Sequence, residues 1–125
     1  MYRQALELME KVLGKEHLST LNSMTNLAFM LNSQGKHHKA EQINRQALEL
    51  MEKALGKEHP LTLNSMTNLA NVLGSQGKYE EAEQMHRQAL ELMEKALGKE
   101  HPLTLRSKNN LRSLLEARTK SSSDL

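Results

Sequence analysis

The sequence predicts an all-α protein built from repeated pairs of helices, and two observations support this prediction. The apolar residues are mostly leucine, methionine and alanine, while aromatic residues make up only 2% of the 125-residue chain. Leucine, methionine and alanine favour helices, whereas strands favour β-branched and aromatic residues. The segment RQALELMEK also begins at Arg3, again at Arg45 and again at Arg87, a step of 42 residues. Self-similarity at a period of roughly 20–50 residues is typical of stacked helical repeats.

Each repeat is expected to contain a helix A, from about Pro60 to Ser75, and a helix B, from about Tyr79 to Leu97. Proline is favoured at the first position of a helix, which suits Pro60 and the matching Pro102. Between the two helices lies Gln76-Gly77-Lys78, where glycine can adopt the left-handed conformation that ends a helix. Gly98 is predicted to end helix B with a turn of the same kind.

Helical periodicity predicts which faces of these helices are buried. At about 100° per residue, the apolar face of helix A contains Met66, Leu69, Ala70 and Leu73. The apolar stripe of helix B is made of Ala82, Met85, Ala89, Met93, Ala96 and Leu97. Six helices are therefore expected, in the order B-A-B-A-B-A, as antiparallel pairs within one repeat domain at 1–118.

The two ends of the chain differ from the central repeat. In the helix expected at about 102–118, Lys108 and Arg112 replace methionine and alanine of the earlier copies, so this helix should cap the stack. Residues 119–125 are predicted to be a disordered tail. The helix expected at Met1–Leu13 has no helix A before it, so its apolar face should be exposed. This predicts either a fragment of a longer array or a homo-oligomer formed through that face.

The central repeat resembles a known family. The chain is similar to the tetratricopeptide repeat signature at Asn68-Leu69-Ala70, Leu73, Gln76-Gly77-Lys78-Tyr79, Ala82 and Ala89-Leu90. The LGKEHP segment after helix B resembles, more particularly, the 42-residue repeats of kinesin light chains, and similar repeats form the C-terminal arrays of fungal NOD-like receptor proteins. The resemblance implies a solenoid, a right-handed superhelix whose A helices line a concave groove. It also implies a non-catalytic scaffold that binds a peptide segment of a partner protein in that groove.

The candidate binding residues lie along one arc of helix A, nearly opposite its buried face. Asn26, Asn68 and Asn110 form a ladder of one amide per repeat, and amides can both donate and accept hydrogen bonds with an extended peptide. Arg106 adds a cation for an acidic side chain or a terminal carboxylate. The alternative is that the asparagines bond only to neighbouring helices or to water. The predicted peptide-binding set is Asn22, Asn26, Phe29, Asn64, Asn68, Asn71, Arg106 and Asn110.

Histidine recurs in the segment KEH, as His17, His59 and His101. Stacked repeats would separate these side chains by about 10 Å, the distance between packed helices. Metal–nitrogen bonds are about 2 Å long, so the three histidines are not expected to share a metal ion. We expect them to help start the following helix A, and we predict no metal site and no cofactor.

Other function classes find little support in the sequence. The net charge is +2, with cations interleaved among glutamates, which does not favour nucleic acid binding. No segment approaches the roughly 18 apolar residues of a membrane span, and no catalytic set or glycine-rich phosphate loop appears. We therefore expect a cytoplasmic, non-enzymatic protein whose partner is a protein or peptide. The alternative function is a structural or self-associating repeat segment with no separate ligand.

Overall fold

The computed structural model describes residues 18–123, and all regular secondary structure in that range is α-helical. The all-α prediction is therefore confirmed for this range. The first expected helix, at Met1–Leu13, lies outside the described residues, so the six-helix order and the handedness of the superhelix stay predictions. The helices described are α2 (Leu18–Ser33), α3 (His37–Leu55), α4 (Pro60–Ser75), α5 (Tyr79–Leu97) and α6 (Pro102–Ser123).

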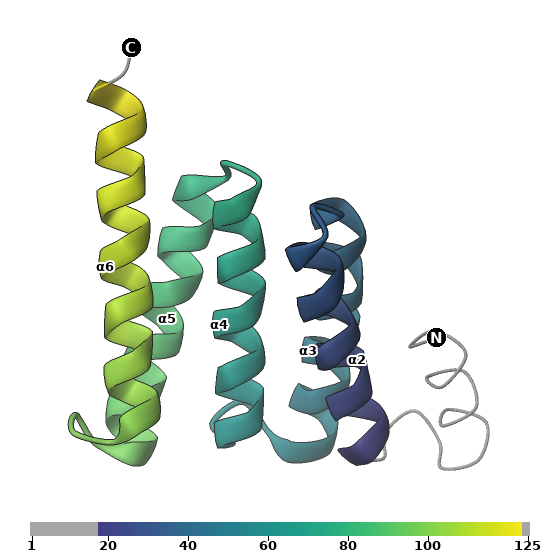
Figure 1. Ribbon diagram of the computed structural model, residues 1–125. Helices are drawn as coiled ribbons and strands as arrows, with labels where there is room; N and C mark the ends of the chain where they lie inside the picture. The colour runs from purple at the N-terminus through teal and green to yellow at the C-terminus, as the bar shows by residue number, and fades with distance from the viewer. Residues whose placement is uncertain (1–17, 124–125) are drawn as a thin grey trace.

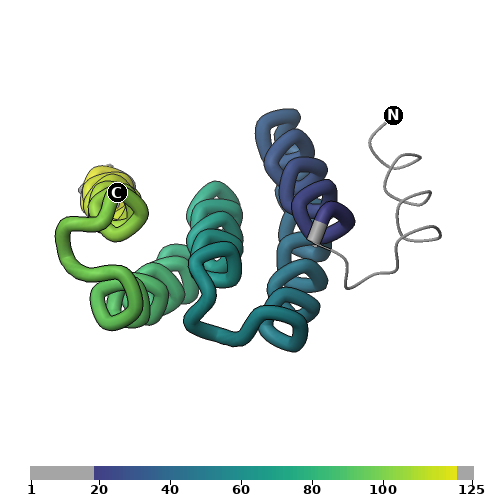
Figure 2. The backbone as a smooth tube through the Cα atoms, turned by 90° about the horizontal axis from the view of Figure 1, so that it is seen from below, coloured from purple at the N-terminus to yellow at the C-terminus, as the bar shows by residue number. Residues whose placement is uncertain are grey.

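The helices form two rows (Figures 1 and 2). The A helices α2, α4 and α6 lie in one row, and the B helices α3 and α5 lie in the other. Each helix packs against the next one along the chain, and α4 also touches both α2 and α6. Consecutive helices run in opposite directions because short turns join them. This is the expected stack of antiparallel pairs, and it brings the A helices together on one side.

The buried core follows the predicted apolar faces. Leu69 and Leu73 of α4 are at most 1% exposed, and they pack with Ala82 of α5 and Leu114 of α6. One cluster therefore joins two consecutive repeats, and the small side chain of alanine lets the helices approach closely. The stripe of α5 is buried at Ala82, Ala89 and Met93, half-buried at Met85 and Leu97, and exposed at Ala96 in the last turn.

The turn from α4 to α5 is closed by hydrogen bonds that need a residue at positive φ. Gly77 has a φ of 82°. Its N–H donates to the carbonyl oxygen of Gly74 at 3.0 Å, and the N–H of Lys78 donates to that of Leu73 at 2.9 Å. This pair of bonds is the Schellman motif. The predicted left-handed role of the glycine in this turn is confirmed.

Replacing Gly77 with alanine is expected to lower the free energy of unfolding by about 1 kcal/mol, because an L residue is strained at this φ. No atom lies within 4 Å of an added Cβ, so the loss would come from backbone strain and not from a clash. Urea unfolding followed by circular dichroism measures the effect. Gly77→Asn is the matched control, and it should lose less unfolding free energy than Gly77→Ala, since asparagine tolerates this conformation. Equal stability of Gly77→Ala and the wild type would contradict this explanation.

The loops after α3 and α5 differ from that turn. Gly56 and Gly98 have φ values of 92° and 94° but ψ values of 160° and 158°. The prediction of a second turn of the same kind is therefore wrong in this detail, because the chain leaves helix B extended in order to reach the next helix A. That helix begins at Pro60 in one repeat and at Pro102 in the next, as predicted.

Histidine side chains cap the A helices that follow these loops. His59 is the N-cap residue of α4, and its Nδ1 accepts a hydrogen bond from the N–H of Leu61 at 3.1 Å. Likewise, Nδ1 of His101 accepts from the N–H of Leu103 at 3.1 Å. These bonds satisfy a backbone donor that the first turn of a helix leaves free. The helix-entry role is confirmed for both histidines, whereas His17 lies outside the described residues.

The last helix is longer than expected. We predicted its end at about residue 118 and disorder from Thr119, but α6 continues to Ser123, so the prediction is not met over 119–123. The guanidinium of Arg118 donates to Glu83 Oε1 at 2.8 Å, and the hydroxyl of Thr119 donates to the carbonyl oxygen of Leu115 at 2.9 Å. These bonds hold the helix past the point where earlier repeats turn. Residues 124–125 lie outside the described range.

Candidate functional site

A groove of about 410 Å³ lies between α2 and α4. Residues of these two helices form its walls, one residue of α3 lies at its floor, and Arg106 of α6 reaches its end. Six of the ten lining residues are asparagines, so the groove offers many hydrogen-bond donors and acceptors. The lining residues are Thr25, Asn26, Phe29, Asn32, Asn44, Asn64, Asn68, Asn71, Val72 and Arg106.

The structure brings most of the predicted binding residues together. Asn22 and Asn110 do not line the groove, although Asn22 is exposed and Asn110 is half-buried. Asn22 lies one turn before the groove on α2, and Asn110 lies on α6, beyond α4. Helical periodicity places residues on a face but does not set where along the stack a hollow forms. The predicted residues that line the groove are Asn26, Phe29, Asn64, Asn68, Asn71 and Arg106.

Asn44 is the lining residue that sequence reasoning missed and that most clearly indicates a ligand. It is 1% exposed, and its Oδ1 is buried without a hydrogen-bond partner among residues 18–123. A buried polar atom without a partner is unfavourable by about 1–3 kcal/mol. The signal was present in the sequence, because a polar residue stands in the apolar stripe of helix B where the next repeat has His86.

An exposed phenylalanine, Phe29, lies on the wall of the groove that α2 forms. Phe29 lines the groove and is 69% exposed, which is unusual for the one phenylalanine of the chain. It stands where the next repeat has Asn71. On the same wall, the amide of Asn32 donates a hydrogen bond to the hydroxyl of Ser75 at 3.5 Å and thus links α2 to α4. An apolar side chain of a ligand could pack on the phenylalanine ring while polar atoms bond to the amides.

Electrostatically, the groove is weakly positive. Arg106 is the only charged residue among the lining residues, and it is exposed. It forms no ion pair within residues 18–123, whereas Arg45, Arg87 and Arg118 each contact a glutamate. A free guanidinium can bind a carboxylate through two parallel hydrogen bonds. The groove is therefore suited to a segment that carries a negative charge.

Outside the groove, a glutamate on each B helix connects consecutive repeats. Burial raises the pKa of Glu41, but hydrogen bonds from Gln76, Arg45 and Lys78 outweigh burial and lower this pKa to about 2. The donor–acceptor distances are 2.7, 2.8 and 3.1 Å. Glu83 is the matching residue one repeat later, where the hydrogen bond from Arg87 chiefly lowers its pKa.

His86 is the most deeply buried titratable group of the described residues. It is 0% exposed, and both ring nitrogens are buried without a hydrogen-bond partner among those residues. Burial lowers the pKa of His86 to about 4, because the imidazolium form would lose its hydration. The ring is therefore neutral at physiological pH.

Neither a metal cluster nor a membrane-spanning helix is found in the described part of the chain. Within residues 18–123, no group of three or more histidine, aspartate or glutamate side chains is arranged to hold a metal ion. None of the helices in this range is long and apolar enough to cross a membrane.

Comparison with known proteins identifies the repeat. The sequence profile of the tetratricopeptide repeat matches residues 1–53, 23–95 and 67–120, which together cover most of the chain. The chain belongs to the tetratricopeptide repeat family. No curated protein matches the chain.

Two solved structures share the tetratricopeptide fold with this chain. Both come from Podosopora anserina and are kinesin light chain-type proteins with nearly identical tetratricopeptide-like repeats, one of them a point variant of the other. The TM-scores are 0.80 for the variant and 0.77 for the other, each at 29% identity and 98% coverage of this chain. The chain spans 57% and 58% of their lengths. The resemblance to kinesin light chain-like repeats is thereby confirmed, and such tetratricopeptide folds serve as protein–protein interaction scaffolds.

Proposed function

We propose that this tetratricopeptide repeat chain binds an extended segment of a partner protein in the groove between α2 and α4, without catalysing a reaction. The observation that carries the proposal is the Oδ1 of Asn44, which is buried at the groove floor and has no hydrogen-bond partner within residues 18–123. Because the side chain of Asn44 lines the groove, a rotation of its amide would bring this oxygen within reach of a backbone N–H of a bound peptide. Such a bond would be formed only on binding and would remove an unfavourable feature of the free protein.

The other lining residues fit a peptide as well. Asn64 and Asn68 lie about one helical turn apart on α4 and can bond to alternate peptide groups of an extended chain, which recur on one side about every 6.8 Å. Phe29 gives an apolar contact for a side chain, and Arg106 gives a charge-assisted contact for an acidic residue or a C-terminal carboxylate. We therefore expect a ligand with a central apolar residue and at least one negative charge.

The variant Asn44→Leu tests the proposal. Leucine has nearly the shape of asparagine and removes the unpartnered amide, so the free energy of unfolding should stay the same or rise. Peptide affinity should instead fall about tenfold, since the bond to the peptide backbone is lost. The ligands are random 12-residue peptides that are selected on the wild-type protein by phage display. The selected peptides are synthesised with a fluorescent label, and their affinity for each variant is measured by fluorescence anisotropy.

Two further variants place the binding site. Arg106→Glu should lower the affinity for acidic peptides about tenfold or more, because the attraction between the guanidinium and the peptide carboxylates becomes repulsion between two negative charges. Asn22→Ala is the matched control, since Asn22 is exposed on α2 but does not line the groove, and it should leave affinity unchanged. The proposal would be overturned if Asn44→Leu bound the selected peptides as tightly as the wild type, or if no peptide specific for the folded protein were selected.

A further inference from the structure

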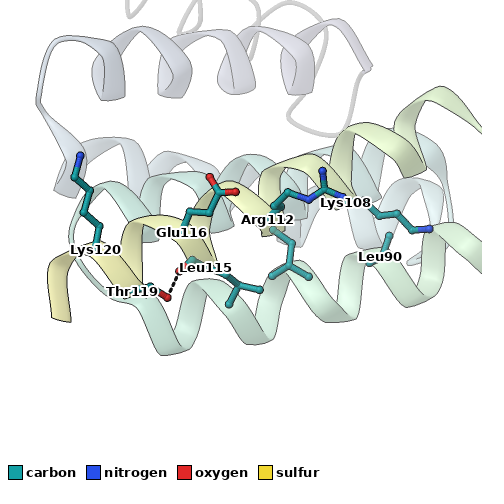
Figure 3. Close-up of a pocket in the computed structure, with 8 residues that line it drawn as sticks. Leu90, Lys108, Arg112, Leu115, Glu116, Thr119 and Lys120 are labelled. Carbon is teal, nitrogen blue, oxygen red and sulfur yellow. Dashed lines mark hydrogen bonds between the residues drawn. The ribbon is translucent and has the colours of Figure 1, made fainter. Parts of the chain in front are cut away.

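A second hollow, larger than the peptide groove, lies between α5 and α6 on the outer side of the last helix (Figure 3). Its volume is about 620 Å³. Its apolar lining residues are Leu90 of α5 and Leu111 and Leu115 of α6, and charged side chains of α6 stand along its edge. The edge residues are Lys108, Arg112, Glu116 and Lys120, all of them exposed. This surface, which we call the α6 groove, is separate from the peptide groove between α2 and α4.

The preceding repeat shows what shape of ligand covers such a floor. The leucines one repeat earlier are Leu48, Leu69 and Leu73. They belong to one cluster, and that cluster is covered by α5 through Ala82 and Met85. The three leucines of the α6 groove are thus arranged as a surface on which an α-helix packs. Leu111 is already 7% exposed, whereas Leu90 and Leu115 are half-buried, and the hollow above them is open within residues 18–123.

The chain does not turn back to cover this surface as earlier repeats do. Thr119 stands where the earlier turns have Gly35 and Gly77, and α6 runs straight through this position. The Schellman turn that would direct a following helix onto the three leucines is therefore not formed. A turn at Thr119 therefore does not supply a covering helix, and the charged residues on the edge indicate which helix would fit there.

The charges on the edge indicate the chemistry of that helix. Lys108 and Arg112 hold the positions of Met66 and Ala70 in the preceding repeat, and Lys120 adds a third cation at the other end of the hollow, about two turns beyond Arg112 along α6. None of these three cations forms an ion pair within the described range, and Glu116 is the single carboxylate among the lining residues. The long stems of lysine and arginine can lie along the leucines while their charges remain at the edge. These cations favour an acidic helix over a basic one.

We propose that the α6 groove binds an acidic amphipathic helix of a partner protein. The apolar strip of this helix, with small residues and methionine or leucine, packs on Leu90, Leu111 and Leu115, as Ala82 and Met85 pack on the preceding repeat. Its glutamates or aspartates flank the strip and meet Lys108 and Arg112. This inference adds a second binding surface to the proposed peptide groove and does not depend on it.

The probe for this test is a synthetic 19-residue peptide with the sequence of α5, made more acidic by Arg87→Glu and Lys95→Glu and labelled with fluorescein. Its anisotropy is titrated with the full chain. Saturable binding is expected. A control peptide with the further changes Ala82→Gln and Ala89→Gln keeps the net charge but interrupts the apolar strip, and it should bind at least about tenfold more weakly.

Variants of the full chain place the bound helix. Lys108→Glu combined with Arg112→Glu should lower the affinity for the acidic peptide about tenfold or more. Because both positions are exposed, the double variant should still fold. Arg106→Glu, in the other groove, should not change this affinity. Failure of the acidic peptide to bind, equal binding of both peptides, or equal weakening by Arg106→Glu would each overturn the proposal. So would sedimentation showing a dimer that the double variant dissociates, because a second copy would then occupy the surface.

Discussion

The variant His86→Asn is expected to resist acid better than the wild type, and this is the largest effect that we predict. Between neutral pH and pH 5, the wild type should lose about 2 kcal/mol of unfolding free energy through this one residue, and about 3 kcal/mol by pH 4. The variant should show neither loss. The measurement is urea unfolding at a series of pH values between 7.5 and 4, with each protein compared with itself at pH 7.5.

The loss of stability in acid follows from the burial of the His86 ring. Burial lowers the pKa of His86 from 6.5 to about 4 in the folded protein, while the unfolded chain keeps the ordinary value. Between these two pH values the unfolded state therefore binds more protons, so acid favours unfolding. Above pH 6.5 both states are neutral at this position and the residue adds no pH dependence. Asparagine does not titrate, and the fold already holds one at this position of the preceding repeat, Asn44.

The control is Gln88→Asn, an exposed position on the same helix. It carries the lower helix propensity of asparagine without removing the buried ring. Its stability should shift by the same amount at every pH, in contrast to His86→Asn. Parallel pH curves for the wild type and His86→Asn would show that the buried imidazole is not the source of acid sensitivity.

Glu41→Ala is expected to lower the free energy of unfolding at pH 7 by about 2 kcal/mol, because three hydrogen bonds to a mostly buried carboxylate are lost. The side chain of Glu41 is 12% exposed. It joins α3 to Gln76 and Lys78 of the next turn, so its removal weakens the contact between repeats. Because repeat arrays unfold cooperatively only through such contacts, the urea transition should also broaden.

The matched control for this prediction lies on the same helix. Glu49 is paired with Lys53 at 4.0 Å but is 71% exposed, so Glu49→Ala should lose only a few tenths of a kcal/mol. The contribution of Glu41 should be complete above pH 4.5 and should disappear as the pH falls towards 2, since its folded-state pKa is lowered to about 2. Equal losses for the two variants would mean that the carboxylate does not join the repeats.

Much of the fold and part of the groove could be predicted from periodicity. The 42-residue step and the glycines and prolines at fixed offsets indicated the helix boundaries, because each of these features acts locally on the backbone. The same spacing placed Asn26, Asn68 and Arg106 on the open face of the A helices, and the structure brings them into one groove. Asn22 and Asn110 were included because they share that face, but they lie beyond the ends of the hollow.

The residues that were missed depend on contacts between repeats. Asn44 and His86 are polar residues within the apolar stripe of helix B, and only packing shows that Oδ1 of Asn44 and both ring nitrogens of His86 are buried without partners within residues 18–123. The extension of α6 past Thr119 was also missed, because Arg118 reaches a glutamate 35 residues away in the sequence. Local propensity cannot reveal a bond of that kind.

The amino-acid sequence by itself determined the family, the helical repeat and the face on which polar residues gather. These follow from the order of residues along each helix, since about 3.6 residues per turn assigns every side chain to a side. The tertiary structure decided where the hollows lie, which polar atoms are buried without partners, and that the hollow above the three leucines of the α6 groove is open in the described range. These properties depend on the distance between neighbouring helices, and that distance is set by the packing of side chains that come from different repeats.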